Sequence, residues 1–329
     1  MTSAIAVAGT NIALVKYWGK RDEALNLPAT GSLSLTLDRL GTRTRVAFDG
    51  GAGGADRVTL DGLPAAPKFA ARATAFLDRV RSRAGLEARA TVETFNSVPT
   101  AAGLASSASG FAALAVAAAR AAGLPLSPAE LSELARLGSG SAARSIFGGF
   151  VEMARGARPD GSDAVAQAIE AGAGWEVRLV VAITAAGEKT IGSTAAMGRT
   201  AATSPYYEAW VRGVEGDLAA ARAAIGARDL SALGAVAERS ALRMHASAMA
   251  ADPPILYWNA ATVAAIGAVK TLRDGGVAAF FTIDAGPHVK VLCAAADAER
   301  IAAALGQTPG VLRTLVAAPG PGARVVEAA

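Results

Sequence analysis

Hydrophobic and polar positions alternate along several short stretches of the chain. Alternation of apolar or β-branched residues with polar ones predicts strands at 4–8, 33–37, 43–49 and 86–95. A valine-rich apolar run predicts a further strand at 176–184. The first 60 residues are therefore expected to be mainly β-structure, and the later strand opens a second half of the chain.

Longer segments with helical periodicity lie between and after these strands. Ser127 and Glu130 form the pattern of a capping box, with proline at the first helical position. Ser204 and Asp229 are expected to cap two later helices. The predicted helices lie at Lys68–Arg83, Ser107–Ala122, 128–138, 205–225, 229–250 and in a segment that ends near Asp274.

The order of the elements bears on the fold class. A loop with a short helix is predicted at 156–174, and strands at 277–283 and 289–293 precede a last helix and strand. Strands and helices mix without strict β-α-β repetition, which favours an α+β fold over a doubly wound sheet. The 329 residues suffice for one large domain or two ordinary ones, and we divide them into 1–174 and 175–329.

Composition narrows the class of protein. Hydrophobic residues make up 52% and charged residues 18%, which is typical of a folded core. No apolar run reaches the ~18 residues that span a bilayer, and the first nine residues lack the basic start of a secretory signal. Cys293 is the one cysteine, so no intrachain disulfide can form and a reducing, cytoplasmic compartment is expected.

Charge and ligand-type residues narrow the chemistry. The net charge is +4 and the pI is near 9.4, but there is no block of lysine and arginine, and aromatic residues make up 5%. A small anionic substrate explains this mild excess better than nucleic acid does. With His245 and His288 as the two histidines, a zinc site is not expected. Any metal should be magnesium, held by oxygen ligands and substrate phosphates.

The run PTAAGLASSASG at 99–110 has the composition of a phosphate-binding loop. Glycine and alanine leave room for backbone amides to close around a phosphate, and the helix at Ser107–Ala122 would direct its N-terminus to the same place. The run is not a Walker A motif, since no lysine follows its last glycine. A buried turn of small residues with serine caps is the alternative, and the loop alone does not decide between them.

Positive charge for such a site must come from other segments. Residues 11–21 bring together Lys16, Tyr17 and two further basic side chains, and 138–145 carries Arg144 behind two serines. A solvated basic turn is the alternative for the first segment, because Lys16 and Tyr17 point to opposite faces of an extended chain.

Asp284 ends a predicted buried strand, directly before a glycine–proline turn. An aspartate there can shape the turn by bonding the backbone two residues on. Alternatively, it is a catalytic carboxylate that orients or deprotonates a hydroxyl. A nearby Lys16 would favour the charged forms of both groups.

Seven motifs in series resemble the diphosphomevalonate decarboxylases, a family of the GHMP kinase superfamily, and they cover nearly the whole chain. They are NIALVKYWGKR (11–21), NLPATGSLSLTL (26–37), PTAAGLASSASGFAAL (99–114), GSGSAARSIFGGFVE (138–152), EKTIGSTAAM (188–197), MHASAMAADPPILYWN (244–259) and FTIDAGPHVK (281–290).

The resemblance implies a GHMP kinase fold with its active site in a cleft. The N-terminal β-α module would be similar to a ribosomal-protein-like domain, and the C-terminal part would be a ferredoxin-like α/β sandwich. The implied reaction uses ATP and Mg²⁺ to phosphorylate the 3-hydroxyl of (R)-5-diphosphomevalonate, and phosphate then leaves with CO₂. The products are isopentenyl diphosphate, ADP, phosphate and CO₂, in the mevalonate route of isoprenoid biosynthesis. A homodimer is also implied.

The resemblance assigns roles to individual residues. Asp284 would act on the 3-hydroxyl as base or orienting group, Lys16 would contact both, and Arg144 would hold the C1 carboxylate. The substrate-binding residues would be Tyr17, Lys20, Ser139, Ser141, Arg144, Ser193 and Met197. The ATP-binding residues would be Asn96, Ala102, Gly103, Leu104, Ala105, Ser106, Ser107 and Ser109, with Ser107 as the magnesium ligand.

The chain departs from the family pattern at Val98, Met153, Thr194 and His288. The last two leave recognition of the diphosphate tail open. The alternatives are a 5-phosphomevalonate decarboxylase and a mevalonate 3-kinase of the same superfamily, although such kinases usually lack the Asp–Lys pair. A non-catalytic nucleic-acid-binding module is a further alternative, and strong, salt-dependent nucleic-acid binding would favour it.

Overall fold

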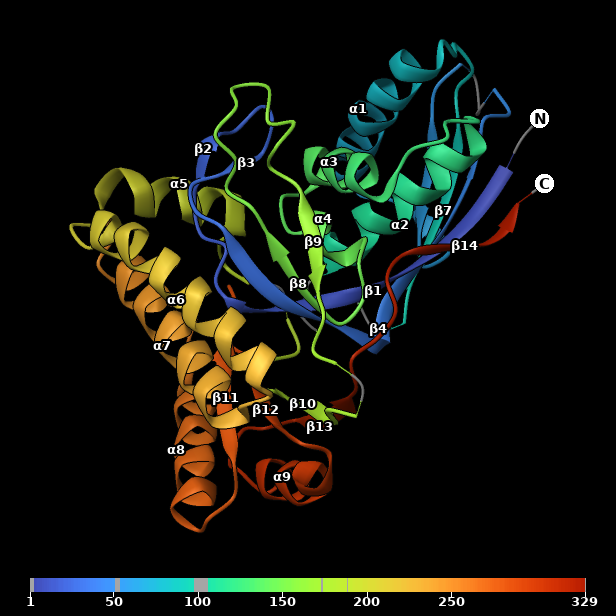
Figure 1. Ribbon diagram of the computed structural model, residues 1–329. Coiled ribbons are helices and arrows are strands. Elements are labelled where there is room, and N and C mark those ends of the chain that lie inside the picture. The colour runs from blue at the N-terminus through green and yellow to red at the C-terminus, as the bar shows by residue number, and fades with distance from the viewer. Residues whose placement is uncertain (1–2, 51–53, 98–105, 173, 188, 329) are drawn as a thin grey trace.

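The structure, a computed structural model, describes residues 3–50, 54–97, 106–172, 174–187 and 189–328. Two main sheets organise these residues, one of eight strands and one of four. Figure 1 shows the larger sheet in the upper half of the molecule and the smaller sheet in the lower half, each with helices beside it. The mixture of strands and helices confirms the α+β class expected from the sequence.

Two long strands form the centre of the larger sheet. Its strands are β1 (Ser3–Val15), β4 (Ser32–Ala47), β5 (Arg57–Leu60), β6 (Leu63–Pro64), β7 (Thr91–Asn96), β8 (Phe150–Met153), β9 (Ala166–Ile169) and β14 (Arg324–Ala328). The hydrogen-bonded order is β14-β1-β4-β7-β5-β6, while β8 pairs with β4 and β9 with β8. β1 is longer than predicted, and β4 joins two predicted strands into one. A small hairpin of β2 (Lys20–Asp22) and β3 (Leu27–Pro28) follows β1.

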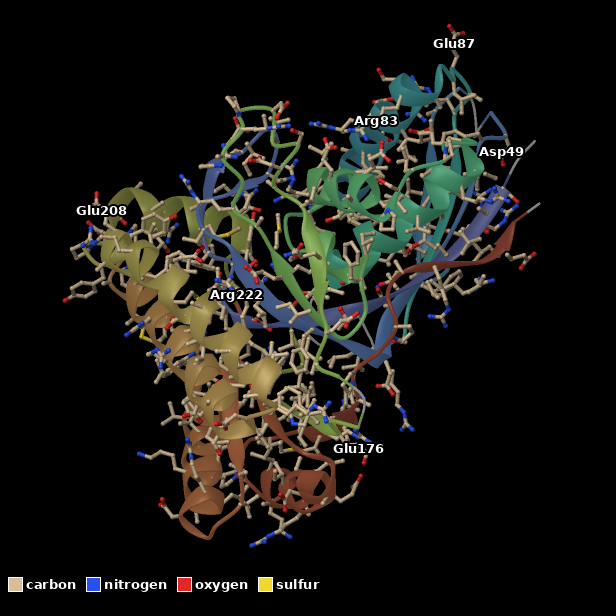
Figure 2. All side chains as sticks on the ribbon, viewed as in Figure 1. Asp49, Arg83, Glu87, Glu176, Glu208 and Arg222 are labelled. Atoms are coloured by element: carbon tan, nitrogen blue, oxygen red, sulfur yellow. The ribbon has the colours of Figure 1, made fainter. Side chains whose placement is uncertain are left out.

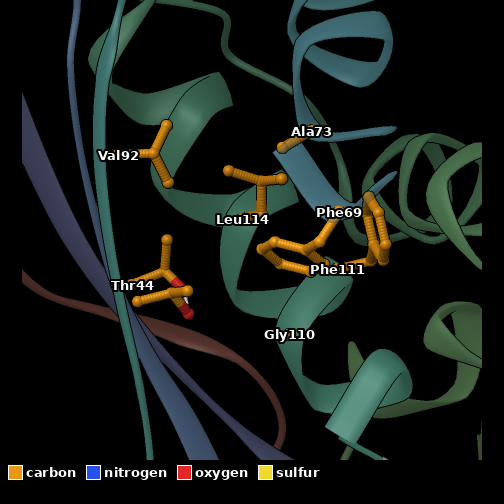
Figure 3. A pocket seen from close by; sticks show the side chains of 8 residues that line it. Thr44, Phe69, Ala73, Val92, Gly110, Phe111 and Leu114 are labelled. Carbon is orange, nitrogen blue, oxygen red and sulfur yellow. Dashed lines mark hydrogen bonds between the residues drawn. The ribbon is translucent and has the colours of Figure 1, made fainter. Parts of the chain in front are cut away.

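Four helices accompany this sheet: α1 (Pro67–Ala84), α2 (Ser106–Ala121), α3 (Pro128–Gly138) and α4 (Ala142–Ser145). The capping box at Ser127 and Glu130 is confirmed. Phe69 of α1 and Phe111 of α2 pack with ring centroids 6.3 Å apart beside a cavity of about 10 Å³ (Figure 3). Because that volume is about that of one water molecule, the core beneath α2 is closed to larger ligands.

The smaller sheet carries the second half of the chain. Its order is β11 (Ala279–Ile283), β12 (Val289–Ala294), β10 (Val177–Ile183) and β13 (Arg313–Ala317). The helical elements are α5 (Ser193–Thr203), α6 (Tyr207–Ala227), α7 (Leu230–Met249), α8 (Ala260–Asp274), η2 (Ala295–Asp297) and α9 (Ala298–Gly306). Asp229 caps α7 as expected, since its carboxylate accepts from the Ala232 amide at 2.9 Å. None of the described helices is long and apolar enough to cross a membrane.

The two halves touch at several points. Arg222 of α6 donates to Glu152 of β8 at 2.6 Å, and Figure 2 labels this arginine. Thr282 of β11 donates to the carbonyl of Ala13 on β1 at 3.1 Å. The last strand, β14, pairs with β1, so the chain returns to the larger sheet at its end. Because Thr282 of β11 bonds to Ala13, the C-terminal end of β1 lies against β11.

Four sequence-based expectations are wrong. Residues 156–174 carry β9 and turns, and their described part holds no helix. Ser204 ends α5 and does not cap α6, whose N-cap is Tyr206. The sequence predicts no helix at Ser193–Thr203, where α5 lies, because this run lacks a clear apolar stripe. The last helix is followed by two strands, β13 and β14, where the sequence predicts one.

Candidate active site

Lys16 is buried at the junction of the two halves. It directly follows β1, its side chain is 2% exposed, and its backbone amide donates to the Ser240 hydroxyl of α7 at 3.0 Å. Its ammonium donates to the Ala13 carbonyl and to Oδ1 of Asp284, both at 2.7 Å. Since a buried ammonium is costly unless paired, this position depends on the aspartate.

Asp284 lies one residue beyond β11, in the turn that leads to β12. Its side chain is 29% exposed, so one side of the carboxylate remains open. Oδ1 accepts from Lys16, and Oδ2 lies 3.3 Å from the Nζ of Lys290 on β12. The carboxylate is thus held by one ammonium on each oxygen. The sequence alternative of a turn-shaping aspartate does not account for these two ion pairs.

The charges of this cluster shift its proton equilibria. Burial by itself would raise the pKa of Asp284, but Lys16 and Lys290 outweigh it and lower that pKa well below its usual range. Burial lowers the pKa of Lys16 to about 8, although Asp284 opposes the shift. At neutral pH the carboxylate is therefore ionised and the Lys16 ammonium is mostly charged.

Arg144, in the short helix α4, is 2% exposed. Its Nε donates to the Ser34 hydroxyl at 2.9 Å, and its two terminal nitrogens donate to the Ser32 hydroxyl at 2.5 Å and the Asn11 amide oxygen at 3.1 Å. In the described part of the chain it forms no ion pair within 4 Å. Burial lowers its pKa to about 10, so the guanidinium stays charged at neutral pH without an adjacent carboxylate.

Tyr17 lies beside Arg144. The Arg144 guanidinium is 6.0 Å from the centre of its ring, a cation–π arrangement. Its hydroxyl is buried and has no hydrogen-bond partner among the described residues. A Cβ on Gly140 would lie 2.2 Å from that hydroxyl oxygen, so the glycine makes room for the tyrosine. A buried hydroxyl without a partner is a donor available to a ligand.

The other predicted substrate residues are distributed around this centre. Ser139 and Ser141 flank Gly140, and their hydroxyl oxygens are 3.5 Å apart. Ser193 opens α5 and accepts from the Lys189 ammonium at 2.8 Å. Met197 is buried in the hydrophobic core that also contains Trp18 and Tyr257.

Lys20 begins β2 and is half-buried, and burial lowers its pKa. The roles of these side chains in substrate binding stay predictions.

Part of the predicted nucleotide site lies within the described chain. Ser106 begins α2, and Ser107, in its first turn, is exposed. Ser109 is buried, and its hydroxyl is 2.7 Å from that of Thr42, which also donates to the amide oxygen of Asn96. The Ser109 hydroxyl and the Asn96 side-chain amide are therefore both bonded to Thr42 of β4. Four of the predicted ATP-binding residues lie outside the described chain: Ala102, Gly103, Leu104 and Ala105.

Sequence reasoning missed several residues of the centre. Lys290 stands in the quoted motif FTIDAGPHVK without a role, although a lysine within the apolar run VKVLC is a signal of a buried charge. Arg144 is held by Ser32, Ser34 and Asn11. No local sequence pattern links these residues with Arg144, because they lie on strands that are distant from it in sequence. His288 is buried, and its Nδ1 accepts from the Thr184 amide at 3.1 Å, so it supports the turn after β10.

The buried Lys16–Asp284 pair and the buried Arg144 give the junction of the two halves the charges that an enzyme would need to bind an anionic substrate. Two family models match the chain: residues 8–166 match the diphosphomevalonate decarboxylase-like N-terminal domain, and residues 179–313 the mevalonate 5-diphosphate decarboxylase C-terminal domain. A diphosphomevalonate decarboxylase of Gibberella zeae is 39% identical over 321 residues, which cover 92% of this chain and 84% of that protein. The human diphosphomevalonate decarboxylase is 36% identical over 88% of this chain and 76% of that protein.

Solved structures agree with these matches. The mevalonate diphosphate decarboxylase of Staphylococcus aureus superposes with a TM-score of 0.94 at 37% identity and 99% coverage of both chains. A structure described as MDDEF in complex with MVAPP, AMPPCP and magnesium gives a TM-score of 0.93 at 42% identity, with 99% of this chain and 100% of that chain covered. The chain belongs to the diphosphomevalonate decarboxylase family, and the expected GHMP kinase fold is confirmed.

Proposed function

We propose that the protein catalyses the ATP-dependent decarboxylation of (R)-5-diphosphomevalonate to isopentenyl diphosphate. The observation that carries this proposal is the buried Arg144, which has three neutral acceptors and no carboxylate in contact, beside the Lys16–Asp284 pair. A buried guanidinium without a carboxylate partner can bind the C1 carboxylate of the substrate. The Lys16–Asp284 pair can contact the 3-hydroxyl of the same substrate. Membership of the family supports the same reaction.

The chemistry requires a tertiary hydroxyl to become a leaving group. The 3-oxygen forms a bond to the terminal phosphorus of ATP, the bond from that phosphorus to the ADP oxygen breaks, and the hydroxyl proton passes to solvent. The C1–C2 bond then breaks, its electron pair forms the C2–C3 double bond, and CO₂ and phosphate leave. Asp284 accepts a hydrogen bond from the 3-hydroxyl and orients it, while Lys16 stabilises negative charge that develops on its oxygen.

Arg144 has a different task in this scheme. It holds the carboxylate through two parallel hydrogen bonds, which places the bond that breaks in a fixed plane. Because its side chain is anchored by Ser32, Ser34 and Asn11, little reorganisation is needed when the substrate binds. The half-buried serines Ser139 and Ser141, together with Lys20 and Ser193, would bind the diphosphate tail.

ATP and Mg²⁺ fit the residues that the structure describes around α2. Ser107 presents an exposed hydroxyl in the first turn of a 16-residue helix, where backbone N–H groups attract phosphate. The described residues contain no group of three histidine, cysteine or acidic side chains that could hold a metal. Mg²⁺ keeps several waters and binds largely through nucleotide phosphates, and Ser107 would be its protein ligand. Bound there, the ion would neutralise phosphate charge. The complex of MDDEF with AMPPCP, an ATP analogue, and magnesium supports the proposal.

The pH dependence should report the ionisation of Lys16. With a pKa of about 8, the Lys16 amine is protonated and positively charged below that pH, and it loses this charge above it. We expect kcat/KM to fall above pH 8 with an apparent pKa near 8, since kcat/KM follows the free enzyme. Arg144 stays charged through this window, because its pKa is about 10. A kcat/KM that is flat to about pH 9.5 would contradict this role of Lys16.

Tyr17→Phe should separate substrate binding from stability. The hydroxyl has no partner among the described residues, so its removal should leave the melting temperature unchanged or slightly higher. A hydrogen bond to a charged phosphate is worth about 1.5–3 kcal/mol, so KM for diphosphomevalonate should rise roughly tenfold or more. Tyr206→Phe, at an exposed tyrosine, is the control. An unchanged KM for the Tyr17 variant would exclude the hydroxyl from the binding site.

The experiment that tests the proposed function compares three substrates. The protein is incubated with ATP, Mg²⁺ and mevalonate that carries zero, one or two phosphates at the 5-position, and CO₂ is measured. We expect release with the 5-diphosphate. Release with the monophosphate alone would make the protein a 5-phosphomevalonate decarboxylase, and ADP formation from mevalonate without CO₂ would make it a 3-kinase.

Finer features of the protein follow the family resemblance and are part of the proposal. We propose a cytoplasmic homodimer, divided into domains at residues 174/175. Light scattering after size-exclusion chromatography tests the dimer, and fractionation of the native cells tests the location. Limited proteolysis between the matched family segments, which end at residue 166 and begin at residue 179, tests the boundary.

A further inference from the structure

Lys290 is a buried charge on the strand after the Asp284 turn. It is 2% exposed, although its neighbours Val289 and Val291 belong to the apolar core of the smaller sheet. Since side chains alternate along a strand, Lys290 points to the opposite face from these valines. Its partner on the neighbouring strand β11 is Thr282, whose hydroxyl donates to the Ala13 carbonyl of β1. That face of the sheet meets the end of β1.

The surroundings of Lys290 give its ammonium one charged partner. Within the described chain, its ion pair is with Oδ2 of Asp284 at 3.3 Å. Lys16 takes the other carboxylate oxygen and also donates to the Ala13 carbonyl, which fixes its own position. A carboxylate with one cation on each oxygen cannot rotate without breaking an ion pair. A core position that needs no charge would normally hold an apolar residue.

We propose that Lys290 is a positioning residue of this site: its ammonium holds Oδ2 of Asp284, so that the carboxylate keeps one orientation and one charge state toward the substrate hydroxyl. Lys290 acts through Asp284 and has no role of its own on the substrate. The effect on turnover rests on the proposed function, whereas the effect on Asp284 does not.

Other charged groups also face Asp284. From the first half of the chain come Lys16, directly after β1, and, at longer range, Arg144 of α4, whose charge interacts with Asp284. From the loop before α5 comes Lys189, which donates to the Ala285 carbonyl at 3.2 Å. His245 of α7 is buried, and burial lowers its pKa to about 3, so it stays neutral. Of these groups, Lys16 and Lys290 form direct ion pairs with the carboxylate.

Removal of the Lys290 charge should therefore act on the acidic side of the pH profile. In Lys290→Met, Asp284 loses one of its two positively charged partners. Its carboxylate should then protonate at a pH about one unit or more higher than in the wild type. We expect the acidic limb of kcat/KM to move upward by that amount and kcat to fall roughly tenfold or more, with KM for ATP unchanged. Lys290→Arg, which keeps the charge, should retain the wild-type acidic limb. Lys270→Gln, at an exposed lysine of α8, is the control.

A second measurement does not depend on turnover. The carboxyl carbon of Asp284 is followed by ¹³C NMR in the free, full-length protein labelled at aspartate, and the Asp284→Asn variant identifies the signal. We expect the titration of this signal to begin at higher pH in Lys290→Met than in the wild type and in Lys290→Arg. A signal that titrates alike in wild type and Lys290→Met overturns the proposal, as does an acidic limb that Lys290→Arg and Lys290→Met shift equally. Wild-type protein that releases no CO₂ would instead refute the proposed function, and the NMR titration would still decide on Lys290.

Discussion

Asp284→Ala is expected to reduce turnover by about 10⁴-fold, to the background of the assay, while ATP binding is retained. The substitution removes the acceptor that orients the 3-hydroxyl. It also leaves Lys16 and Lys290, both 2% exposed, without their shared counter-ion. The charge of Lys16 then becomes harder to maintain, so the group that would stabilise the developing oxyanion is lost as well. Steady-state CO₂ release and calorimetric ATP binding measure the two effects.

Asp217→Ala provides a matched control for the loss of a buried, paired aspartate. Asp217 is 4% exposed on α6, and its ion-pair partners are Arg239, which donates to it at 2.9 Å, and Arg243. We expect this variant to melt at a lower temperature and to keep its kcat. If Asp284→Ala retains near-normal kcat, or if both variants lose activity in proportion to their melting temperatures, then Asp284 has no part in the reaction.

Arg144→Lys is expected to lower kcat/KM for diphosphomevalonate by roughly 10²-fold or more, even though the charge is kept. Ser32, Ser34 and Asn11 each accept from a different guanidinium nitrogen, and an ammonium cannot satisfy three such acceptors and also bind a carboxylate bidentately. The carboxylate would then be held with the wrong orientation for loss of CO₂. Both kcat and KM should change, since the contact exists in the ground state and in the transition state.

Arg81→Lys is the corresponding control for a buried arginine. Arg81 is 5% exposed near the end of α1 and donates to both oxygens of Asp56. We expect lower stability with unchanged kcat/KM. A mild effect of Arg144→Lys, comparable to that of the control, would mean that the substrate carboxylate is held elsewhere.

Local patterns predicted much of the secondary structure. The capping box at Ser127 and the helix at Lys68–Arg83, seen as Pro67–Ala84, depend on residues close in sequence. The predictions failed where the pattern was weak. Helix α5 spans Ser193–Thr203, a run of small and polar residues whose buried positions are set by packing against other helices. Strand β14 was missed because its pairing partner, β1, lies at the other end of the chain.

The site was predictable only through the resemblance. Lys16 and Asp284 are 268 residues apart in sequence, and no local pattern links them. Their proximity arises because β1 ends against β11, which is a property of the whole fold. Lys290 was visible as a lysine in an apolar strand, but its partner could not be named before the turn at Asp284 was seen to fold back on it. Burial without a counter-ion, which Arg144 shares with Arg136 among the described residues, is likewise visible only in three dimensions.

The central claim is that one site couples phosphoryl transfer from ATP to loss of CO₂. Its most direct test is the stoichiometry of a single reaction, with diphosphomevalonate labelled at C1, ATP and Mg²⁺, in which ADP and labelled CO₂ are counted together. The account predicts one CO₂ for each ADP, with isopentenyl diphosphate as the organic product. ADP formed without CO₂, or CO₂ released without ATP, would contradict it.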